Sequence, residues 1–539
     1  MTDAGGDRSA FARRHTDGPG ASVTPPRVLH VVQQLSRGGA ARAFVAAAAC
    51  QQRAGTFTHH ILSLLADIEP GARRLAADAE LPVTAGAGDA NVDALIAAAD
   101  IVHVHYWNTP ELVAFLQRLT SPARIVLTCH VPGDTPPHVL HRELVAWADV
   151  TIADGPYGYA LPVFRDLDER TRAERTGLVI DTPDFSRLAH VTPRPHAGFT
   201  VGYIGTVDPV KMHPDYVAMS AAVDVPDVRF IVCGNGGGFA GLRKDAAARG
   251  VLNRFELRGY VEDIASVLAE LDVFGYPVTH SAIELVLQEA MFAGVPPVVL
   301  ATDGAARTVD HGRTGLVVDS PDAYTRAIER LYHDPAERRR LGANAAAHAR
   351  EAFGAARAAE VLTEIYERMT GRPKRAHAWP FPDRASAGSD EAVRSAGAWT
   401  FVDMIGAGAA EPFLASLTSR DSGALLDAEA AIAAAPPVIA DGASGGVIHY
   451  RRCYPSDPHL RLWTGLVLGT QGRPALAIAE LDAARRLGLD HWRVSWYVAQ
   501  LARRAGAVPL ARQALDRALA AAPDFQPAVD ARAALAEQA

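Results

Sequence analysis

The fold is decided by residues 271–300, LDVFGYPVTHSAIELVLQEAMFAGVPPVVL. A buried strand is expected to end near Pro277, and a helix is expected from about Ala282 to Phe292. A second short apolar run, residues 295–301, then predicts another buried strand. A strand, a helix and a strand in this order form a βαβ unit, which belongs to a parallel sheet.

The same alternation extends outward in both directions. Short runs rich in Val, Ile and Leu follow one another as FTVGYIG, VRFIVCG, RFELRGYV and TGLVVD, and nearer the N-terminus as RVLHVVQQL, DIVHVHYW and RIVLTCHV. The pattern resets near Pro193 and Pro195, and a helical run over residues 323–370 follows the second set. We therefore predict an α/β fold of two Rossmann-like lobes that face a cleft, with ligands beyond the carboxyl ends of the strands.

The C-terminal part repeats itself with a period of 34 residues. GRPALAIAELDAA from Gly472 aligns with GAVPLARQALDRA from Gly506. This alignment pairs Leu476 with Leu510, Ala477 with Ala511, Leu481 with Leu515 and, upstream, Trp463 with Tyr497. The period and the small residues predict an α-helical tetratricopeptide-like domain, and a plain helical hairpin is the alternative.

These patterns divide the chain into five parts. They are a disordered leader (1–26), an N-terminal Rossmann-like lobe (27–192), a C-terminal Rossmann-like lobe (193–371), a Pro- and Ser-rich linker (372–398) and a helical domain (399–539).

Composition excludes several classes of protein. The net charge of −8 is unlike that of a protein that coats nucleic acid. The four cysteines lie far apart without zinc-finger spacing, so neither a disulfide scaffold nor a structural metal is expected. No apolar run reaches the ~18 residues of a membrane span, and residues 1–26 lack a signal-peptide pattern. A cytoplasmic protein is expected, with peripheral association at the membrane as an alternative.

Several residues at predicted strand ends have the chemistry of a ligand site. Gly38 and Gly39 follow the first strand and precede a helix, where backbone N–H groups could face an anion, although a tight turn explains them equally well. His130 stands where a buried strand ends, where its imidazole could touch a ligand or be only a hydrogen-bonded histidine at a strand terminus. Lys211 follows Gly205 and Thr206 in the loop after another strand, where its charge could neutralise a diphosphate or remain solvated.

The deciding stretch adds three more candidates. Ser281 and Glu284 match the S-x-x-E capping box, yet the same helix N-terminus could hold phosphate oxygens. Glu289 has no capping role, and its carboxylate could accept hydrogen bonds from a ribose. The alternative is that Glu289 is an ordinary exposed glutamate on the helix surface. His103 and His105 are expected to line the core or cleft, because no third metal ligand is evident.

Over residues 27–370 the chain resembles the GT-B glycosyltransferases of family 4. The resemblance is strongest in residues 284–318, ELVLQEAMFAGVPPVVLATDGAARTVDHGRTGLVV. It implies a nucleotide-diphosphate sugar donor of the UDP or GDP type on the C-terminal lobe and an acceptor on the N-terminal lobe. It also implies retention at the anomeric carbon, and neither a required metal nor another cofactor.

The resemblance assigns roles by position. Glu289 matches the glutamate that binds the nucleotide ribose, Lys211 the lysine on the diphosphate, and His130 the histidine near the transferred sugar. Gly38 and Gly39 match the glycine loop of the N-terminal lobe. Tyr260 and Val261 occupy the segment that usually cradles the base.

Two positions depart from the family pattern. Thr206 replaces an arginine that would contact the diphosphate, and Ser281 stands where the family has its first glutamate. Glu284 could substitute for that glutamate in an E-x4-E arrangement, which makes Glu284 a catalytic candidate beside His130 and Lys211.

The sequence therefore predicts a glycosyltransferase with an unidentified glycan, lipid or protein acceptor. Its helical repeats are expected to bind a protein partner. An alternative hypothesis is that the protein is not an enzyme but a catalytically silent scaffold. A third hypothesis is a sugar-nucleotide epimerase or hydrolase on the same fold.

Overall fold

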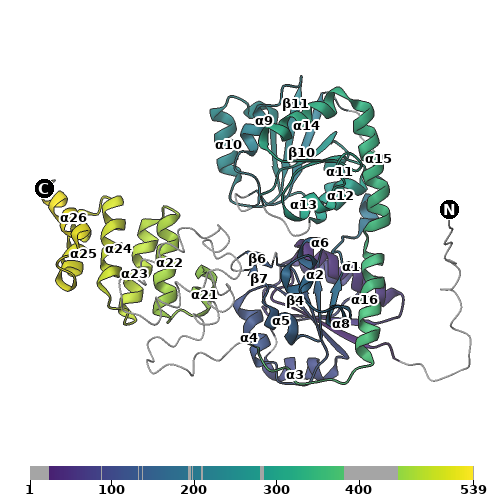
Figure 1. The fold of residues 1–539 in the computed structure, drawn as a ribbon, viewed down its shortest axis with the longest axis horizontal. Helices are drawn as coiled ribbons and strands as arrows, with labels where there is room; N and C mark the ends of the chain where they lie inside the picture. The colour runs from purple at the N-terminus through teal and green to yellow at the C-terminus, as the bar shows by residue number, and fades with distance from the viewer. Residues whose placement is uncertain are drawn as a thin grey trace, which may run out of the picture.

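The computed structural model describes residues 24–86, 88–131, 133–135, 138–191, 196, 198–207, 211–279, 284–380 and 447–537. Two α/β lobes stack one above the other, and a helical domain lies beside the first lobe (Figure 1). Ser281 lies outside the described residues, as do most of the predicted leader and residues 381–446.

The first lobe is built on a parallel sheet of seven strands. Its strands are β1 (Arg27–Val32), β2 (Thr58–Ser63), β3 (Val83–Ala85), β4 (Ile101–Tyr106), β5 (Ile125–Cys129), β8 (Val150–Ala153) and β9 (Thr176–Leu178). They lie in the order β3-β2-β1-β4-β5-β8-β9, and β6 (Asp134–Thr135) pairs separately with β7 (His138–Val139). Its helices are α1 (Gly39–Arg53), α2 (Pro70–Asp78), α3 (Asp89–Ala98), α4 (Pro110–Arg118), α5 (Arg142–Trp147), α6 (Pro156–Tyr159), α7 (Pro162–Arg165) and α8 (Glu169–Arg175).

The second lobe repeats this architecture with six parallel strands. They are β10 (Phe199–Ile204), β11 (Val228–Cys233), β12 (Phe255–Gly259), β13 (Val273–Tyr276), β14 (Pro297–Leu300) and β15 (Leu316–Val318), in the order β12-β11-β10-β13-β14-β15. Its helical elements are η2 (Phe185–Leu188), α9 (Tyr216–Ala221), α10 (Phe239–Ala248), η3 (Leu252–Arg254), α11 (Ile264–Leu268), α12 (Leu285–Phe292), α13 (Asp303–Thr308), α14 (Pro321–His333) and α15 (Pro335–Ala352).

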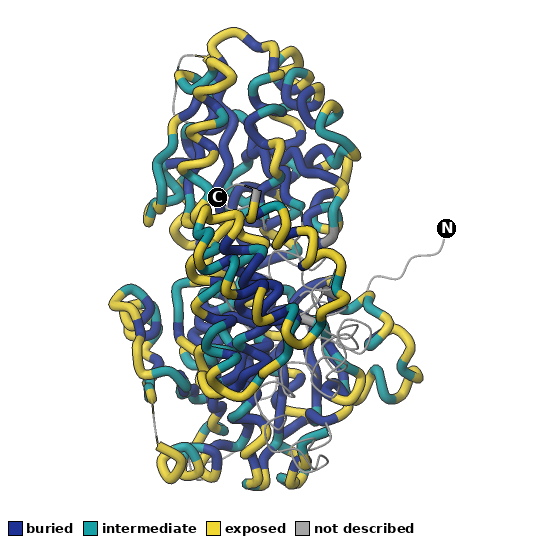
Figure 2. The backbone as a smooth tube through the Cα atoms, turned by 90° about the vertical axis from the view of Figure 1, so that its left-hand side faces the viewer, coloured by how far each residue is buried: buried dark blue, intermediate teal, exposed yellow. Residues whose placement is uncertain are grey.

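Both predicted lobes are confirmed, and the second sheet contains all six predicted strands. The central strands are buried along most of their length because helices cover both faces of a parallel sheet. Figure 2 shows this burial in the interior of both lobes. Strands β2, β3, β8 and β9 were missed by the sequence patterns. β2 contains His59 and His60 within THHILS, and the other three strands have only three or four residues.

The chain passes between the lobes twice. Phe185 and Leu188 of η2 already pack in the core of the second lobe, before residue 193. Helix α16 (Ala355–Thr370), which the sequence-based division assigned to the second lobe, returns and packs on α1 of the first lobe. Its Tyr366 hydroxyl lies 2.6 Å from Nδ1 of His103. The two lobes are therefore joined by two separate segments of chain.

The helical domain comprises α21 (Val447–Cys453), α22 (Pro458–Thr470), α23 (Pro474–Arg486), α24 (Trp492–Arg504), α25 (Val508–Ala521) and α26 (Gln526–Glu537). Ala477 and Ala511 are fully buried at matching positions, and Leu481 and Leu515 likewise. A side-chain carbon on Gly465 would lie 2.8 Å from Leu481, so this glycine lets α22 and α23 approach closely. The predicted repeat of paired helices is confirmed.

Among the described residues, none of the helices combines the length and the hydropathy required to cross a bilayer.

Candidate active site

The site predicted from the sequence lies where the two lobes meet. In each sheet the order in which successive strands are added reverses at a central strand. The reversal lies between β1 and β4 in the first lobe and between β10 and β13 in the second. Ligands of such sheets bind beyond the carboxyl ends of the strands next to this point. The loops that follow these four strands, together with β5, carry most of the predicted site residues.

The glycine loop of the first lobe directly faces the second lobe. Gly38 is the N-cap of α1 and Gly39 is its first residue. A side-chain carbon on Gly39 would lie 3.2 Å from Cδ1 of Leu285, the first residue of α12. A larger residue at Gly39 would therefore push against the helix that carries the other candidates.

Lys211 and Glu284 form an ion pair within the second lobe. The distance from Lys211 Nζ to Glu284 Oε1 is 2.8 Å, and the Tyr276 hydroxyl donates to Glu284 Oε2 at 2.6 Å. Glu284 is the N-cap of α12, but its buried side chain makes no capping hydrogen bond. The capping-box alternative therefore does not describe this carboxylate, which instead faces the loop after β10.

Glu289 lies one turn further along α12 and faces the first lobe. Its side chain is paired with the guanidinium of Arg42 on α1. Glu289 is only 2% exposed, so the alternative of an exposed helical glutamate is wrong. Burial raises the pKa of this carboxyl, and the nearby Arg42 charge opposes that rise.

His130 sits at the end of β5 between two carboxylates that the sequence analysis did not single out. Its Nδ1 is 3.1 Å from Asp181 Oδ2 and 3.8 Å from Asp154 Oδ2. Burial lowers the pKa of His130, but the charge of Asp181, followed by that of Asp154, raises it above the ordinary value overall. Burial and the adjacent Asp181 raise the pKa of Asp154 to about 8.

Asp181 also connects this cluster to the second lobe. Its backbone N–H donates to the carbonyl of Asp154 at 2.9 Å, and its own carbonyl accepts from Gln288 Nε2 of α12 at 2.9 Å. Asp154 and Asp181 follow β8 and β9, which are too short to be recognised by periodicity. In the sequence, each of these aspartates is marked only by a short run of residues before it that contains Val or Ile.

Four buried histidines form a hydrogen-bonded row across neighbouring strands. His59 on β2, His30 on β1, His105 on β4 and His130 after β5 are linked by contacts of 3.0, 3.0 and 2.9 Å between ring nitrogens. Burial lowers the pKa of His30 and His105, so these rings are neutral and each offers one donor and one acceptor. His103 and His105 are buried in the sheet, as expected, and His103 contacts Tyr366 and Thr128. The sequence did not identify His30 as a third histidine beside them.

The remaining candidates are more scattered. Gly205 follows β10 and donates its N–H to Cys233, and the Thr206 carbonyl accepts from the Tyr203 hydroxyl. Tyr260 is 49% exposed after the edge strand β12, where Arg37 of the first lobe lies 4.8 Å from its ring centre. Val261 packs against the core of the second lobe.

The structure thus brings Lys211, Glu284 and Glu289 together at α12, with Gly39 against the same helix. His130 connects to α12 through Asp181 and Gln288. Tyr260 lies opposite Arg37 at a second contact between the lobes. The roles of all these residues stay predictions.

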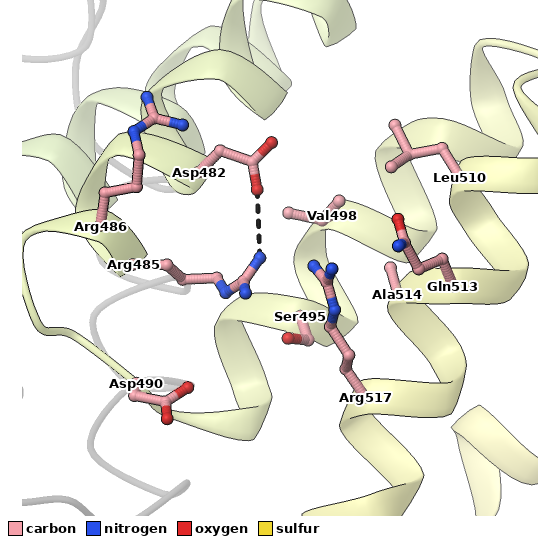
Figure 3. Close-up of a pocket in the computed structure, with 10 residues that line it drawn as sticks. All are labelled: Asp482, Arg485, Arg486, Asp490, Ser495, Val498, Leu510, Gln513, Ala514 and Arg517. Atoms are coloured by element: carbon pink, nitrogen blue, oxygen red, sulfur yellow. Dashed lines mark hydrogen bonds and ion pairs between the residues drawn. The ribbon is translucent and has the colours of Figure 1, made fainter.

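The helical domain has a pocket of its own, of about 520 Å³, between α23, α24 and α25 (Figure 3). Arg485, Arg486 and Arg517 supply positive charge around it, and Arg485 is paired with Asp482 at 3.2 Å. Asp490 contributes a further negative charge to the lining. The lining therefore carries three guanidinium groups and two carboxylates.

Two family models match the chain. Residues 184–348 match glycosyl transferases group 1, and residues 454–524 match the tetratricopeptide repeat. The first of these matches covers most of the second lobe and includes α12.

Named relatives include D-inositol 3-phosphate glycosyltransferases from two actinobacteria. The one from Streptomyces avermitilis is 30% identical over 50% of this chain and 65% of its own length. The one from Salinispora tropica is 27% identical over 52% of this chain and 66% of its own length. The chain therefore spans just under two thirds of each of these relatives.

Solved structures share the two-lobe fold. Anabaena HepE, in complex with UDP and glucose, aligns with a TM-score of 0.53 at 18% identity, over 64% of this chain and 99% of that one. A glycosyltransferase from Rickettsia africae aligns with a TM-score of 0.55 at 13% identity, over 65% of this chain and 100% of that one. The GT-B arrangement of the two lobes is thereby confirmed.

Proposed function

We propose that this chain is a glycosyltransferase that moves a sugar from a UDP- or GDP-type donor to a glycan, lipid-linked or protein acceptor. The observation that carries the proposal is the placement of Lys211, Glu284 and Glu289 on and beside α12, with Lys211 paired to Glu284 and Glu289 paired to Arg42 of the first lobe. The match to glycosyl transferases group 1 over this region supports it, and so do the names of the relatives.

In this proposal the second lobe binds the donor. Lys211 and the N-terminus of α12 attract the diphosphate, and the Gly38 and Gly39 amides approach it from the other lobe. Glu289 accepts hydrogen bonds from the ribose, so Arg42 must share or release this carboxylate when the nucleotide binds. Gly205 and Thr206 lie beside the phosphates, and Tyr260 and Val261 lie beside the base.

Transfer then depends on charge stabilisation. Breaking the bond between the anomeric carbon and the diphosphate leaves negative charge on the phosphate, which Lys211 stabilises in place of a metal ion. His130 contacts the transferred sugar, and the departing phosphate takes the proton of the acceptor on the same face. The anomeric configuration is retained without an enzymic nucleophile, as in family 4.

The helical domain in this proposal recruits the acceptor or an assembly partner. The arginines around the pocket in Figure 3 favour an acidic segment of a partner protein. The silent scaffold is the second candidate function, and the observation in its favour is that Arg42 already occupies the Glu289 carboxylate.

A thermal-shift panel with UDP, GDP and ADP separates the two candidates. We expect one nucleotide to raise the melting temperature of the wild-type protein, and Glu289→Ala to abolish the shift. Glu351→Ala, which removes an exposed glutamate of α15, is the matched control and should respond like the wild type. Failure of every nucleotide to shift the wild type would favour the scaffold.

Turnover then tests the chemistry. We expect release of the nucleotide diphosphate to require both donor and acceptor. Rapid donor breakdown without an acceptor would indicate a hydrolase or an epimerase instead.

A further inference from the structure

The junction between the helical domain and the first lobe holds three side chains of different chemistry. Glu111 comes from α4, whereas His449 and Cys453 come from α21. Their ligand atoms all lie within 4.8 Å of one another. We infer that these three residues bind a zinc-class divalent cation that fastens the helical domain to the first lobe.

The distances suit a tetrahedral cation. His449 Nε2 is 3.2 Å from Glu111 Oε2, and Cys453 Sγ is 3.4 Å from Glu111 Oε1. Zinc bonds of about 2.0–2.3 Å at tetrahedral angles place neighbouring ligand atoms about 3.3–3.6 Å apart. His449 and Cys453 contact different oxygens of Glu111, so a small rotation of this carboxylate would admit the ion, with water in the fourth position.

The spacing on α21 supports the same conclusion. His449 and Cys453 are four residues apart, so they lie on one face of the helix, one turn from each other. Imidazole and thiolate together select zinc over magnesium or calcium, which prefer oxygen ligands alone. The spacing of the cysteines did not reveal this site, because it contains one cysteine and Glu111 lies 338 residues from His449.

The surroundings provide both support and access. Gln33 Nε2 donates to Glu111 Oε2 at 2.9 Å and so orients the carboxylate from outside the site. A groove of about 560 Å³ is lined by Glu111, Cys453 and Tyr454, and also by Asp89, Asp93 and Arg118, so that three carboxylates face one guanidinium. Cys453 is exposed, so a cation attracted by these carboxylates would reach the thiol directly.

Two other clusters have less suitable geometry. The rings of His30, His103 and His105 pack with centres 4.4–5.3 Å apart. Their nitrogens already contact one another or the side chains of His59, His130, Tyr366 and Thr128. His130, Asp154 and Asp181 belong to the candidate active site. Neither cluster contains a cysteine. A thiolate-to-metal absorption band would therefore report on the junction and not on these two clusters.

Binding would displace the proton of the Cys453 thiol to solvent, leaving a thiolate bonded to the metal. The ion would then join residues from two domains. A partly buried Glu–His contact at a domain junction contributes modest stability, whereas a shared metal ion holds the two domains together more firmly.

Cobalt(II) titration of the EDTA-treated full-length protein tests the inference, because Co²⁺ replaces zinc and its thiolate complexes absorb light. We expect one equivalent per chain to produce the thiolate-to-cobalt band, and zinc to displace it. Cys453→Ser should abolish the band. Cys50→Ser, which removes a partly exposed cysteine of α1, is the matched control and should retain it.

A second variant tests whether the ion joins the helical domain to the first lobe. Glu111→Gln changes a residue of the first lobe, so a loss of about tenfold or more in metal affinity is expected only if the ion joins the two domains. Circular dichroism of each variant establishes that it is folded. The inference is overturned by a wild type without the thiolate band, by a band that persists in Cys453→Ser, or by unchanged affinity in Glu111→Gln.

Discussion

Lys211 and Glu284 form an ion pair of 2.8 Å in the second lobe, although one residue follows β10 and the other begins α12. The pair holds the loop after β10 against the helix that carries Glu289. The Tyr276 hydroxyl supports the same carboxylate from β13. Lys211 is thus held in place without a ligand, which would reduce the reorganisation that the proposed transfer step requires.

Lys211→Met should remove the cation that, in the proposed reaction, stabilises the departing diphosphate. We expect kcat to fall by about 10²–10³-fold, which corresponds to about 3–4 kcal/mol of transition-state stabilisation. Steady-state kinetics with the preferred donor measure this effect. Lys244→Met removes an exposed lysine of α10 and should leave kcat unchanged. Equal rates in the two variants would exclude Lys211 from the reaction.

Arg42→Met should destabilise the contact between the lobes, because it leaves the buried Glu289 carboxylate without its partner. A loss of about 1–3 kcal/mol is expected from denaturant unfolding, since the arginine itself is partly exposed. The double variant Arg42→Met/Glu289→Gln should recover much of that loss, because no charge then stays buried. If the double variant is no more stable than Arg42→Met, the ion pair does not explain the loss.

Asp154 should make stability depend on pH. Its folded-state pKa of about 8 lies above the ordinary value of 3.8, so the folded protein holds a proton that the unfolded chain releases. This contribution is complete below about pH 4 and is lost as the pH rises through 8. Asp154→Asn should therefore gain stability relative to the wild type between pH 5 and 9, as melting temperatures measured across that range would reveal. A constant difference would contradict the raised pKa.

The repeat domain offers a matched pair of leucines on α23. Leu481→Ala should cost about 2–5 kcal/mol, because the side chain is fully buried against α22. Leu476→Ala, at a position that is 47% exposed, should change stability by no more than about 0.5 kcal/mol. Thermal unfolding followed by tryptophan fluorescence would report both, since Trp463 lies in the same core. Similar losses at the two positions would contradict the buried register of the repeat.

Local patterns were sufficient for the architecture. Apolar runs separated by helical segments predicted both lobes, and the period of 34 predicted the repeat, because burial of a strand or helix face leaves a regular trace in neighbouring residues. The same patterns placed Lys211 and Glu284 at the same edge of one sheet, as the structure has them.

Only the tertiary structure decided which side chains meet. Arg42 reaches Glu289 across 247 residues, Asp154 and Asp181 surround His130, and His449 reaches Glu111 across 338 residues. The hydrophobic pattern of a helix or strand shows which of its faces is buried, but it does not show which element packs against that face. Helix α16 illustrates the point, because its amphipathic pattern predicts a helix, while its packing on the first lobe depends on the α1 surface that it covers.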